Sequence, residues 1–220
     1  MMSVLTLDKV TYQYDGSNQG VLKNISTKFE MGTVYAIIGK SGAGKSTLLS
    51  LIAGLDVPTE GTVNYKEQNL SQIDRDHYRA QDIGVIFQSY NLLTNATAVE
   101  NIVLSMNISN VKTTDKEGSA LDLLKQMNID AETAKRKILK LSGGQQQRVG
   151  IARALAHQPD IILADEPTGN LDGETEDEVL EILKKLAVNE GKCVIIITHS
   201  DKVAEMADVV LRLENGKVVA

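Results

Sequence analysis

The sequence predicts an α/β fold with three parts: a mostly parallel sheet core, an amino-terminal antiparallel β-lobe and an inserted α-helical subdomain. Strand-length apolar runs alternate with helical patterns late in the chain, which is typical of a parallel sheet covered on both faces. Strand patterns dominate the amino-terminal stretch. Between these two regions, residues 89–140 show mainly helical patterns.

The amino-terminal region is predicted to consist of short strands and one helix that follows a glycine-rich loop. Its first two strand patterns flank a turn-like segment at residues 15–20, which is rich in Gly, Asn and Asp. In order, the predicted strands are residues 4–10, 21–29, 33–38, 61–65 and 83–87, and the helix is residues 45–53.

The inserted subdomain is predicted from helical periodicity. Leu121, Leu124 and Met127 recur at helical spacing, with Lys, Asp and Gln between them. A second helical piece is predicted at residues 131–139.

The last region returns to alternating helices and strands, and its first helix stops before Pro159. The predicted elements are a helix at residues 146–157, a strand at 161–164, a helix whose apolar stripe is Val179, Ile182, Leu183 and Leu186, and a strand at 193–198.

The length of 220 residues suits one domain with lobes. We therefore expect a single domain over residues 1–220. Its core and β-lobe comprise residues 1–88 and 141–220, and the helical subdomain comprises residues 89–140.

Composition excludes several classes of protein. The formal net charge is −6, from 23 basic and 29 acidic residues, which disfavours a nucleic-acid surface.

Cys193 is the single cysteine and lies in an apolar run, so a buried thiol is expected rather than a disulfide or a metal ligand. No apolar stretch approaches the roughly 20 residues that cross a bilayer, and no signal-peptide pattern opens the chain. We expect a cytoplasmic protein whose membrane role, if any, needs a spanning partner.

Residues 39–46 match the phosphate-loop pattern G-x-x-x-x-G-K-S/T, with a predicted strand before them and a helix after them. Glycines let backbone N–H groups turn toward phosphate oxygens, and the helix amino terminus adds a favourable dipole. Lys45 is then expected to reach the β- and γ-phosphates, and Ser46 to bind Mg²⁺. The alternative, a glycine-rich turn without a ligand, does not account for both flanking elements.

Asp165 and Glu166 follow the apolar strand predicted at residues 161–164. Such a strand directs its last residues into the crevice at the carboxyl edge of the sheet, where ligands bind. Asp165 is expected to hold Mg²⁺, and Glu166 to orient or deprotonate the attacking water. By themselves, two acids before Pro167 could equally cap a helix.

Weaker signals come from residues at other strand ends. Gln88 and His199 each follow an apolar strand, which places them beside the predicted phosphate site. Tyr12 and Tyr14 are two residues apart, so they share a face on a strand. Either tyrosine could stack on a nucleobase or pack in the β-lobe.

The sequence Leu-Ser-Gly-Gly-Gln at residues 141–145, called here the LSGGQ segment, is the rarest feature of the chain. Ser142, Gly143 and Gly144 precede a helix and resemble a second anion-binding helix start. One phosphate loop already serves one triphosphate, so this second start is surplus within a single chain. A serine helix cap explains Ser142 but leaves the glycine pair unexplained.

Together these motifs resemble the nucleotide-binding subunit of ABC (ATP-binding cassette) transporters over nearly the whole chain. The resemblance implies a P-loop NTPase fold with a RecA-like core, ATP and Mg²⁺ as ligands, and a head-to-tail pair in which each LSGGQ segment contacts the γ-phosphate held by the other subunit. A membrane-spanning permease is implied as the further partner, with the cassette peripheral on the inner face of the membrane.

The family pattern also implies a set of site residues, with Tyr14 favoured for adenine. The catalytic set is Glu166, His199, Gln88 and Lys45. The nucleotide-binding set is Tyr14, Gly39, Ser41, Gly42, Gly44, Lys45, Ser46, Thr47, Ser142, Gly143, Gly144, Gln145 and Asp172. The Mg²⁺ set is Ser46, Gln88 and Asp165.

Within the family, residues 145–149, 166–172 and 97–102 look most like the group that serves macrolide export, lipoprotein release and antimicrobial-peptide resistance. Two other function classes use the same cassette. Relatives acting in ribosome rescue or DNA repair usually carry two cassettes or a long coiled-coil insertion, which this sequence lacks, and its acidity argues against nucleic acid. A cassette that drives a cell-division or wall-hydrolase complex without moving cargo is compatible with the sequence.

Overall fold

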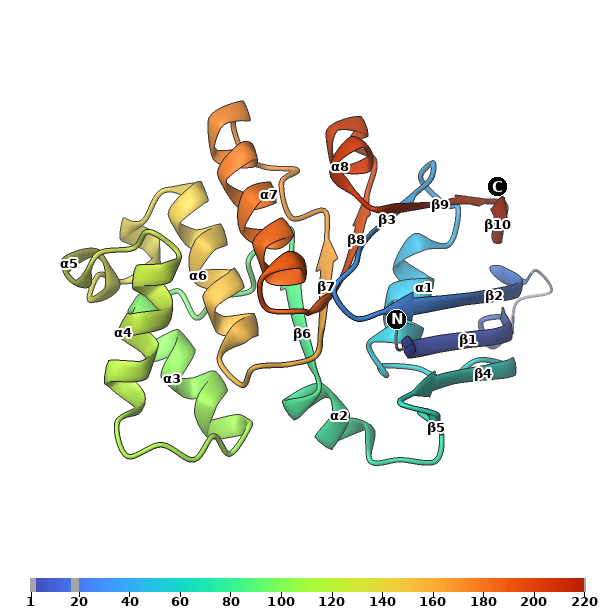
Figure 1. Cartoon of the computed structure of the whole chain (residues 1–220), viewed down its shortest axis with the longest axis horizontal. Coiled ribbons are helices and arrows are strands. Elements are labelled where there is room, and N and C mark those ends of the chain that lie inside the picture. The colour runs from blue at the N-terminus through green and yellow to red at the C-terminus, as the bar shows by residue number, and fades with distance from the viewer. Residues whose placement is uncertain (1–2, 17–19, 220) are drawn as a thin grey trace.

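The computed structural model describes residues 3–16 and 20–219, arranged as two sheets and a group of helices (Figure 1). The strands are β1 Ser3–Tyr12, β2 Leu22–Glu30, β3 Val34–Ile38, β4 Glu60–Tyr65, β5 Gln68–Asn69, β6 Ile83–Phe87, β7 Ile161–Asp165, β8 Cys193–Thr198, β9 Val209–Glu214 and β10 Lys217–Val219. The helices are α1 Lys45–Ile52, α2 Arg75–Gln81, α3 Ala98–Ile108, α4 Lys116–Gln126, α5 Ala131–Ala134, α6 Gly143–Leu155, α7 Gly173–Val188 and α8 Asp201–Met206, with a 3₁₀ helix at Ile138–Lys140.

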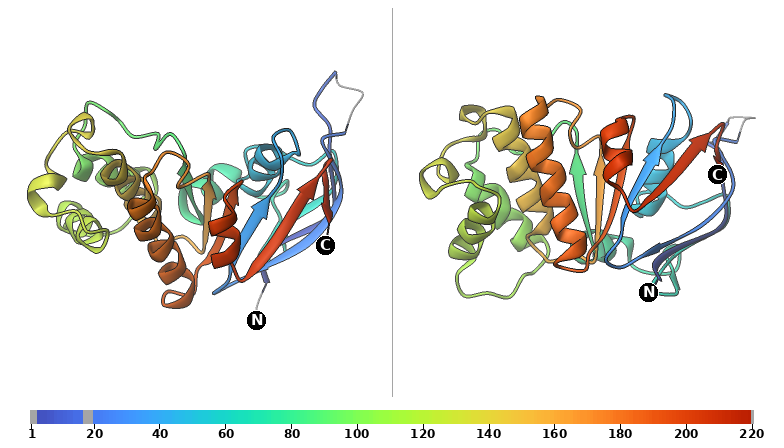
Figure 2. Two further views of the ribbon diagram at one scale, coloured as in Figure 1. Left: turned by 90° about the horizontal axis from the view of Figure 1, so that it is seen from above. Right: turned by 45° about the horizontal axis from the view of Figure 1, so that its top comes forward.

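The two sheets confirm the predicted fold class. The larger sheet has the order β10-β9-β3-β8-β7-β6, and the pairs from β9 to β6 are parallel, while β10 pairs antiparallel with β9. The smaller sheet has the order β2-β1-β4-β5 and is antiparallel throughout. In all three views the smaller sheet and helices α3 to α6 lie at opposite ends of the larger sheet (Figures 1 and 2).

The larger sheet divides the interior into two cores, because successive side chains of a strand point to opposite faces. In β8, Val194 and Ile196 pack in the core shared with α3, α6 and α7. Their neighbours Ile195 and Ile197 pack in the core shared with α1 and the β-lobe. Each fully buried aliphatic side chain contributes about 1.5–3 kcal/mol. The near-continuous apolar strands in the sequence therefore reflect burial on both faces.

Cys193 begins β8 and is fully buried, as the sequence predicted. Burial raises the pKa of its thiol to about 12. The thiol is therefore uncharged and unreactive at neutral pH.

Residues 131–139 do not form the single helical piece that their pattern predicted. Helix α5 ends at Ala134, and the backbone then pairs with the segment before α3. An isolated antiparallel bridge joins Thr97 to Lys137, and Ile138 N–H donates to the Ala96 carbonyl at 3.1 Å. A short helix has marginal stability without tertiary support. Hydrogen bonds from this backbone to the segment before α3 therefore replace the bonds of a continued helix.

Several other boundaries differ from the prediction. Helix α6 begins three residues earlier than expected, because Ser142 and Gln145 form a capping box at its start. Strand β1 ends at Tyr12, so Tyr14 lies beyond the strand. The predicted turn at residues 15–20 includes Ser17–Gln19, which lie outside the described residues. Helices α2 and α8 and strands β5, β9 and β10 were not predicted.

Candidate functional site

The phosphate loop connects β3 to α1 and borders a cavity of about 520 Å³, whose lining includes Gly39, Ser41, Gly42 and His199. Gly44, with φ +105°, is the N-cap residue that immediately precedes α1. A Cβ at this position would lie 2.8 Å from a methyl group of Leu22, and left-handed backbone disfavours side chains. Both constraints explain the glycine before Lys45.

The Lys45 ammonium is held by the loop itself. Its Nζ donates to the carbonyl oxygens of Gly39, at 2.6 Å, and Lys40, at 3.3 Å. Phosphate oxygens are stronger acceptors for an ammonium group than neutral carbonyls are. A phosphate in the loop would therefore compete for these donors, and Lys45 is already next to the position where it would act.

Tyr12 and Tyr14 have different environments, which bears on the two roles that the sequence left open: packing in the β-lobe and stacking on a nucleobase. Tyr12 is buried, and its hydroxyl donates to Asp56. Tyr14 is 51% exposed, lies edge-on to the Tyr12 ring at 5.1 Å and hydrogen-bonds through its hydroxyl to Thr47 Oγ1 at 2.9 Å. The packing role thus belongs to Tyr12, while the exposed Tyr14 ring lies next to the first turn of α1.

Parallel pairing brings the predicted strand-end residues to one edge of the larger sheet. Phe87 pairs with Asp165, and Asp165 with Ile197, so Gln88, Glu166 and Thr198 stand level at the ends of neighbouring strands, and His199 follows one residue later. Ile38, which leads into the phosphate loop, pairs with Thr198. The sheet therefore gathers these side chains as the sequence predicted.

Asp165 is half-buried at this edge. Burial, followed by the nearby charge of Glu166, raises the pKa of the Asp165 carboxyl above its ordinary value, and Lys45 opposes the shift. Concentrated negative charge of this kind suits a cation, and Mg²⁺ commonly binds through one or two carboxylates plus substrate phosphates. Ser46, Gln88 and Asp165 would each offer the oxygen donor that Mg²⁺ prefers.

Glu166 is held by the end of the next strand. Thr198 Oγ1 donates to Glu166 Oε2 at 2.9 Å, and His199 Nδ1 donates to Glu166 Oε1 at 2.7 Å. Glu166 has φ +46°, an unfavourable value for this residue type. Strained backbone beside converging polar groups is common at active sites. The sequence assigned no role to Thr198, although its position at the end of an apolar strand was visible.

Gln88 contacts the segment between β7 and α7. Asn170 Nδ2 donates to the Gln88 carbonyl at 3.3 Å, and Gln88 Nε2 lies 3.5 Å from Asn170 Oδ1. The loops that follow β6 and β7 are therefore joined directly. Asp172, two residues beyond Asn170, caps α7 by accepting from Thr175 N–H at 3.0 Å.

The LSGGQ segment forms a capping box at the start of α6. Ser142 Oγ accepts from Gln145 N–H at 3.2 Å, and Gln145 Oε1 accepts from Ser142 N–H at 3.0 Å. The side chains of Ser142 and Gln145 are thereby occupied. The N–H groups of Gly143 and Gly144 belong to the first turn, where a helix offers them no internal acceptor.

Gly144 also has a packing reason that the sequence did not reveal. A Cβ on Gly144 would overlap Cγ2 of Thr175 at the start of α7. A Cβ on Gly143 would lie 3.1 Å from the hydroxyl oxygen of Tyr90. The glycine pair therefore permits close approach of α7 and of the loop after β6.

None of the LSGGQ residues lines the cavity of the phosphate loop. Helix α6 lies among the helices at one end of the larger sheet, whereas α1 lies toward the β-lobe (Figures 1 and 2). The two anion-binding helix starts of this chain are thus separate.

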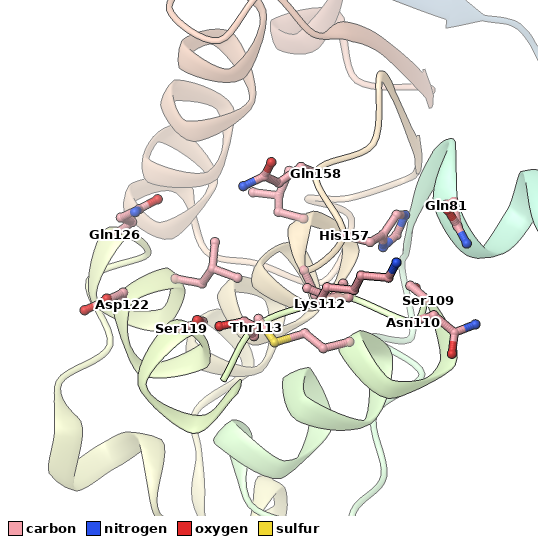
Figure 3. A pocket seen from close by; sticks show the side chains of 15 residues that line it. Gln81, Ser109, Asn110, Lys112, Thr113, Ser119, Asp122, Gln126, His157 and Gln158 are labelled. Atoms are coloured by element: carbon pink, nitrogen blue, oxygen red, sulfur yellow. The ribbon is translucent and has the colours of Figure 1, made fainter. Parts of the chain in front are cut away.

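A second cavity, of about 580 Å³, lies between α3, α4 and the end of α6 (Figure 3). Its walls include Lys112, Asp122 and His157, and it contains none of the predicted site residues. It is distinct from the phosphate-loop cavity.

Among the described residues, no helix combines the length and the apolar character that crossing a membrane requires.

Comparison with known proteins places this geometry in a family. The family model described as "ABC transporter" matches residues 22–169. An uncharacterized ABC transporter ATP-binding protein, YclH of Bacillus subtilis, is 43% identical over 98% of this chain and 95% of its own length. The lipoprotein-releasing system ATP-binding protein LolD of Legionella pneumophila is 39% identical over 99% of this chain and 97% of its own.

A solved structure agrees in fold. The dimeric ABC transporter cassette MJ0796, from Methanocaldococcus jannaschii, superposes with a TM-score of 0.89 at 38% identity, covering 98% of this chain and 97% of its own. The same cassette is also known as a dimer in a post-hydrolysis state bound to ADP and Pi. The chain therefore belongs to the ABC transporter family, as one of its ATP-hydrolysing cassettes.

Proposed function

We propose that two copies of this chain pair head to tail, that each LSGGQ segment contacts the nucleotide held by the other copy, and that ATP-driven closure of the pair drives a separate membrane-spanning partner. One observation carries this proposal: α6, with its capped start, lies among the helices at one end of the larger sheet, apart from α1 and the phosphate loop of the same chain (Figures 1 and 2). The dimeric form of the related cassette MJ0796 supports the pairing.

The proposed site residues fall into three groups by role. Phosphate binding is assigned to backbone N–H groups of the loop and to the Lys45 ammonium, magnesium binding to oxygen donors, and catalysis to Glu166 with His199. The nucleotide groups are Tyr14, Gly39, Ser41, Gly42, Gly44, Lys45, Ser46 and Thr47 of one copy and Ser142, Gly143, Gly144, Gln145 and Asp172 of the other. The magnesium groups are Ser46, Gln88 and Asp165.

In the proposed hydrolysis, some of these groups stabilise charge on the phosphates and others orient or deprotonate the attacking water. Bound Mg²⁺ would neutralise charge that develops on the β- and γ-phosphates. Lys45 and the loop amides bind the remaining oxygens before the reaction begins, so little reorganisation is needed. Glu166 accepts a hydrogen bond from the attacking water and takes its proton. His199 and Thr198 hold the Glu166 carboxylate in one orientation.

The membrane partner is proposed to dock near the loop after β6 and on α3. Leu104 and Ile108 lie one helical turn apart on α3 and are 41% and 64% exposed. Leu93, in the loop before α3, is 54% exposed. Exposed large apolar side chains such as the neighbouring Leu104 and Ile108 favour a protein interface. This location would keep the chain in the cytoplasm, on the inner face of the membrane.

The cargo is proposed to be a peptide, a lipoprotein or a drug-like molecule that is exported or extracted. The sequence patterns at residues 145–149 and 166–172 and the identity to LolD support this group. We also propose that residues 1–220 form one domain, in which residues 1–88 and 141–220 are the core with its β-lobe and residues 89–140 are the helical subdomain.

The Glu166→Gln variant tests the proposal. It keeps the shape of the side chain and removes its basicity, so hydrolysis is expected to fall at least a hundredfold, while an ATP-bound dimer accumulates and is visible by size-exclusion chromatography. The same trapped variant, purified from membranes, is expected to retain one membrane-spanning protein. Retained hydrolysis would contradict the role of Glu166, and a strictly monomeric variant in ATP would contradict pairing.

A further inference from the structure

The loop that follows Gln88 has an unusual backbone. Tyr90 and Asn91 have φ values of +61° and +50°, so two consecutive residues with side chains are left-handed. Asparagine tolerates this conformation, but for a bulky residue it is unfavourable. Contacts outside the loop must therefore hold it in place.

Arg153, in the last turn of α6, supplies those contacts. Its guanidinium donates from Nη2 to the Tyr90 carbonyl at 3.0 Å and from Nη1 to the Asn91 carbonyl. Both acceptors come from the left-handed pair. The Arg153 side chain is partly buried, yet an arginine stays charged in proteins, so the two bonds are charge-assisted.

The same loop also lies alongside α6. The Tyr90 hydroxyl lies next to Gly143, while the Tyr90 carbonyl faces Arg153 about three turns further along the helix. Tyr90 thus extends along the helix that the LSGGQ segment begins. On its other side, the loop continues from Gln88, which contacts Asn170.

We propose that Arg153 is a positioning residue that fixes the Gln88 loop to helix α6, so that Gln88 in one nucleotide site moves with the LSGGQ segment that completes the other. This inference rests on the proposed function, in which Gln88 and the LSGGQ segment serve different nucleotides of a pair. Because the guanidinium contacts two carbonyls of the loop and nothing in the phosphate site, it acts through Gln88 rather than on the nucleotide.

The contact itself is tested by a spin label in the loop. Ser89 is exposed between Gln88 and Tyr90, and the buried Cys193 thiol does not react, so a Ser89→Cys variant takes a single label. Arg153→Met keeps the length of the side chain and removes its donors. It is expected to make the label measurably more mobile. Arg148→Met is the control, because Arg148 lies on the same helix and pairs with Glu178 instead. Equal mobility in both variants would overturn the proposal.

The consequence for hydrolysis is tested with the full chain. Arg153→Met is expected to lower kcat roughly 10- to 100-fold, the loss typical of a misplaced group, with the KM for ATP changed less than about threefold and thermal stability no lower than in Arg148→Met. Arg153→Lys, which restores charge and donors, is expected to recover part of kcat. In a Gln88→Ala background, Arg153→Met should have little further effect.

The outcomes separate this inference from the function on which it rests. If Arg153→Met lowers kcat by the same factor with and without Gln88, the residue does not act through Gln88 and the proposal fails. If the wild-type chain shows no hydrolysis while the label still responds to Arg153→Met, the contact stands and the proposed function fails. If Arg153→Met does not fold, Arg153→Lys decides: a lower kcat accompanied by greater label mobility supports the contact, whereas a lower kcat at wild-type mobility refutes it.

Discussion

Nδ1 of His199 donates a hydrogen bond of 2.7 Å to Oε1 of Glu166, and Thr198 Oγ1 donates to the other carboxylate oxygen at 2.9 Å. Three features of the chain produce this arrangement: an apolar strand ending in Thr198, its parallel neighbour ending in Asp165, and a left-handed residue at Glu166. The carboxylate is therefore oriented by the fold before any substrate enters.

Removing the Thr198 hydroxyl should slow hydrolysis without affecting ATP binding. Thr198→Val keeps the shape of the side chain but deletes one charge-assisted hydrogen bond to Glu166, so kcat is expected to fall about tenfold. Steady-state ATPase assays measure the effect. Ser200→Ala is the matched control, because the Ser200 hydroxyl lies near Glu176 and does not contact Glu166. A kcat for Thr198→Val equal to that of Ser200→Ala would contradict the positioning role.

Asp165→Asn should stabilise the protein in the absence of nucleotide while abolishing Mg²⁺-dependent hydrolysis. The pKa of Asp165 is raised, so the folded state binds the proton more tightly than the unfolded state. The contribution of Asp165 to the free energy of unfolding is thus fully present below the ordinary carboxyl pKa. It is lost as pH rises through the raised pKa of the folded state. At pH 7 the neutral amide avoids this loss, and Tm is expected to rise by roughly 2 °C.

Differential scanning calorimetry at pH 4 and pH 7 measures this difference. The gain in Tm should shrink at the lower pH, where the wild-type carboxyl is protonated in part. A lower Tm for Asp165→Asn at pH 7 would mean that the ionised carboxylate is stabilised by contacts that the structure does not show.

Tyr14 substitutions should separate ring stacking from the bond to Thr47. Tyr14→Phe loses only the hydroxyl and should keep the KM for ATP within about twofold, whereas Tyr14→Ala loses the ring and should raise KM roughly three- to tenfold. Tyr12→Phe, which loses its bond to Asp56, should leave KM unchanged. If Tyr14→Phe raised KM as much as Tyr14→Ala, the hydroxyl rather than the ring would be the binding group.

Gly144→Ala should lower both Tm and kcat, because the added methyl overlaps Thr175 Cγ2. Adding Thr175→Ser removes that methyl group and should restore most of Tm. We expect kcat to stay low in the double variant, since the Cβ of residue 144 would still stand at the helix start proposed to face phosphate. Recovery of kcat together with Tm would show that Gly144 serves packing alone.

The sequence predicted the features that depend on strand ends. Gln88, Asp165, Glu166 and His199 were placed correctly because parallel strands end at a common edge, and apolar runs mark such strands clearly. The division of the two tyrosines needed the structure, since Tyr12 is buried in the core of the β-lobe and bonds to the distant Asp56.

Other features depend on contacts between distant segments and carry no local signal. The break after Ala134 comes from pairing with residues 96–98, and the fit of Gly144 depends on Thr175. Arg153 reads locally as an ordinary helical residue, and only the left-handed pair at Tyr90 and Asn91 shows what its guanidinium contacts.

Mixing two inactive variants tests the central claim, that each nucleotide site is shared between two copies. Lys45→Ala disables the phosphate loop, and Ser142→Arg disables the LSGGQ segment. A mixed pair then contains one site with both defects and one intact site. With equal amounts and random pairing, hydrolysis should recover to roughly a quarter of the wild-type rate. As a control, excess Lys45→Ala/Ser142→Arg double variant, which leaves no intact site in a mixed pair, should suppress the wild-type rate. A mixture no more active than its two components, together with a wild-type rate untouched by the double variant, would contradict the shared site.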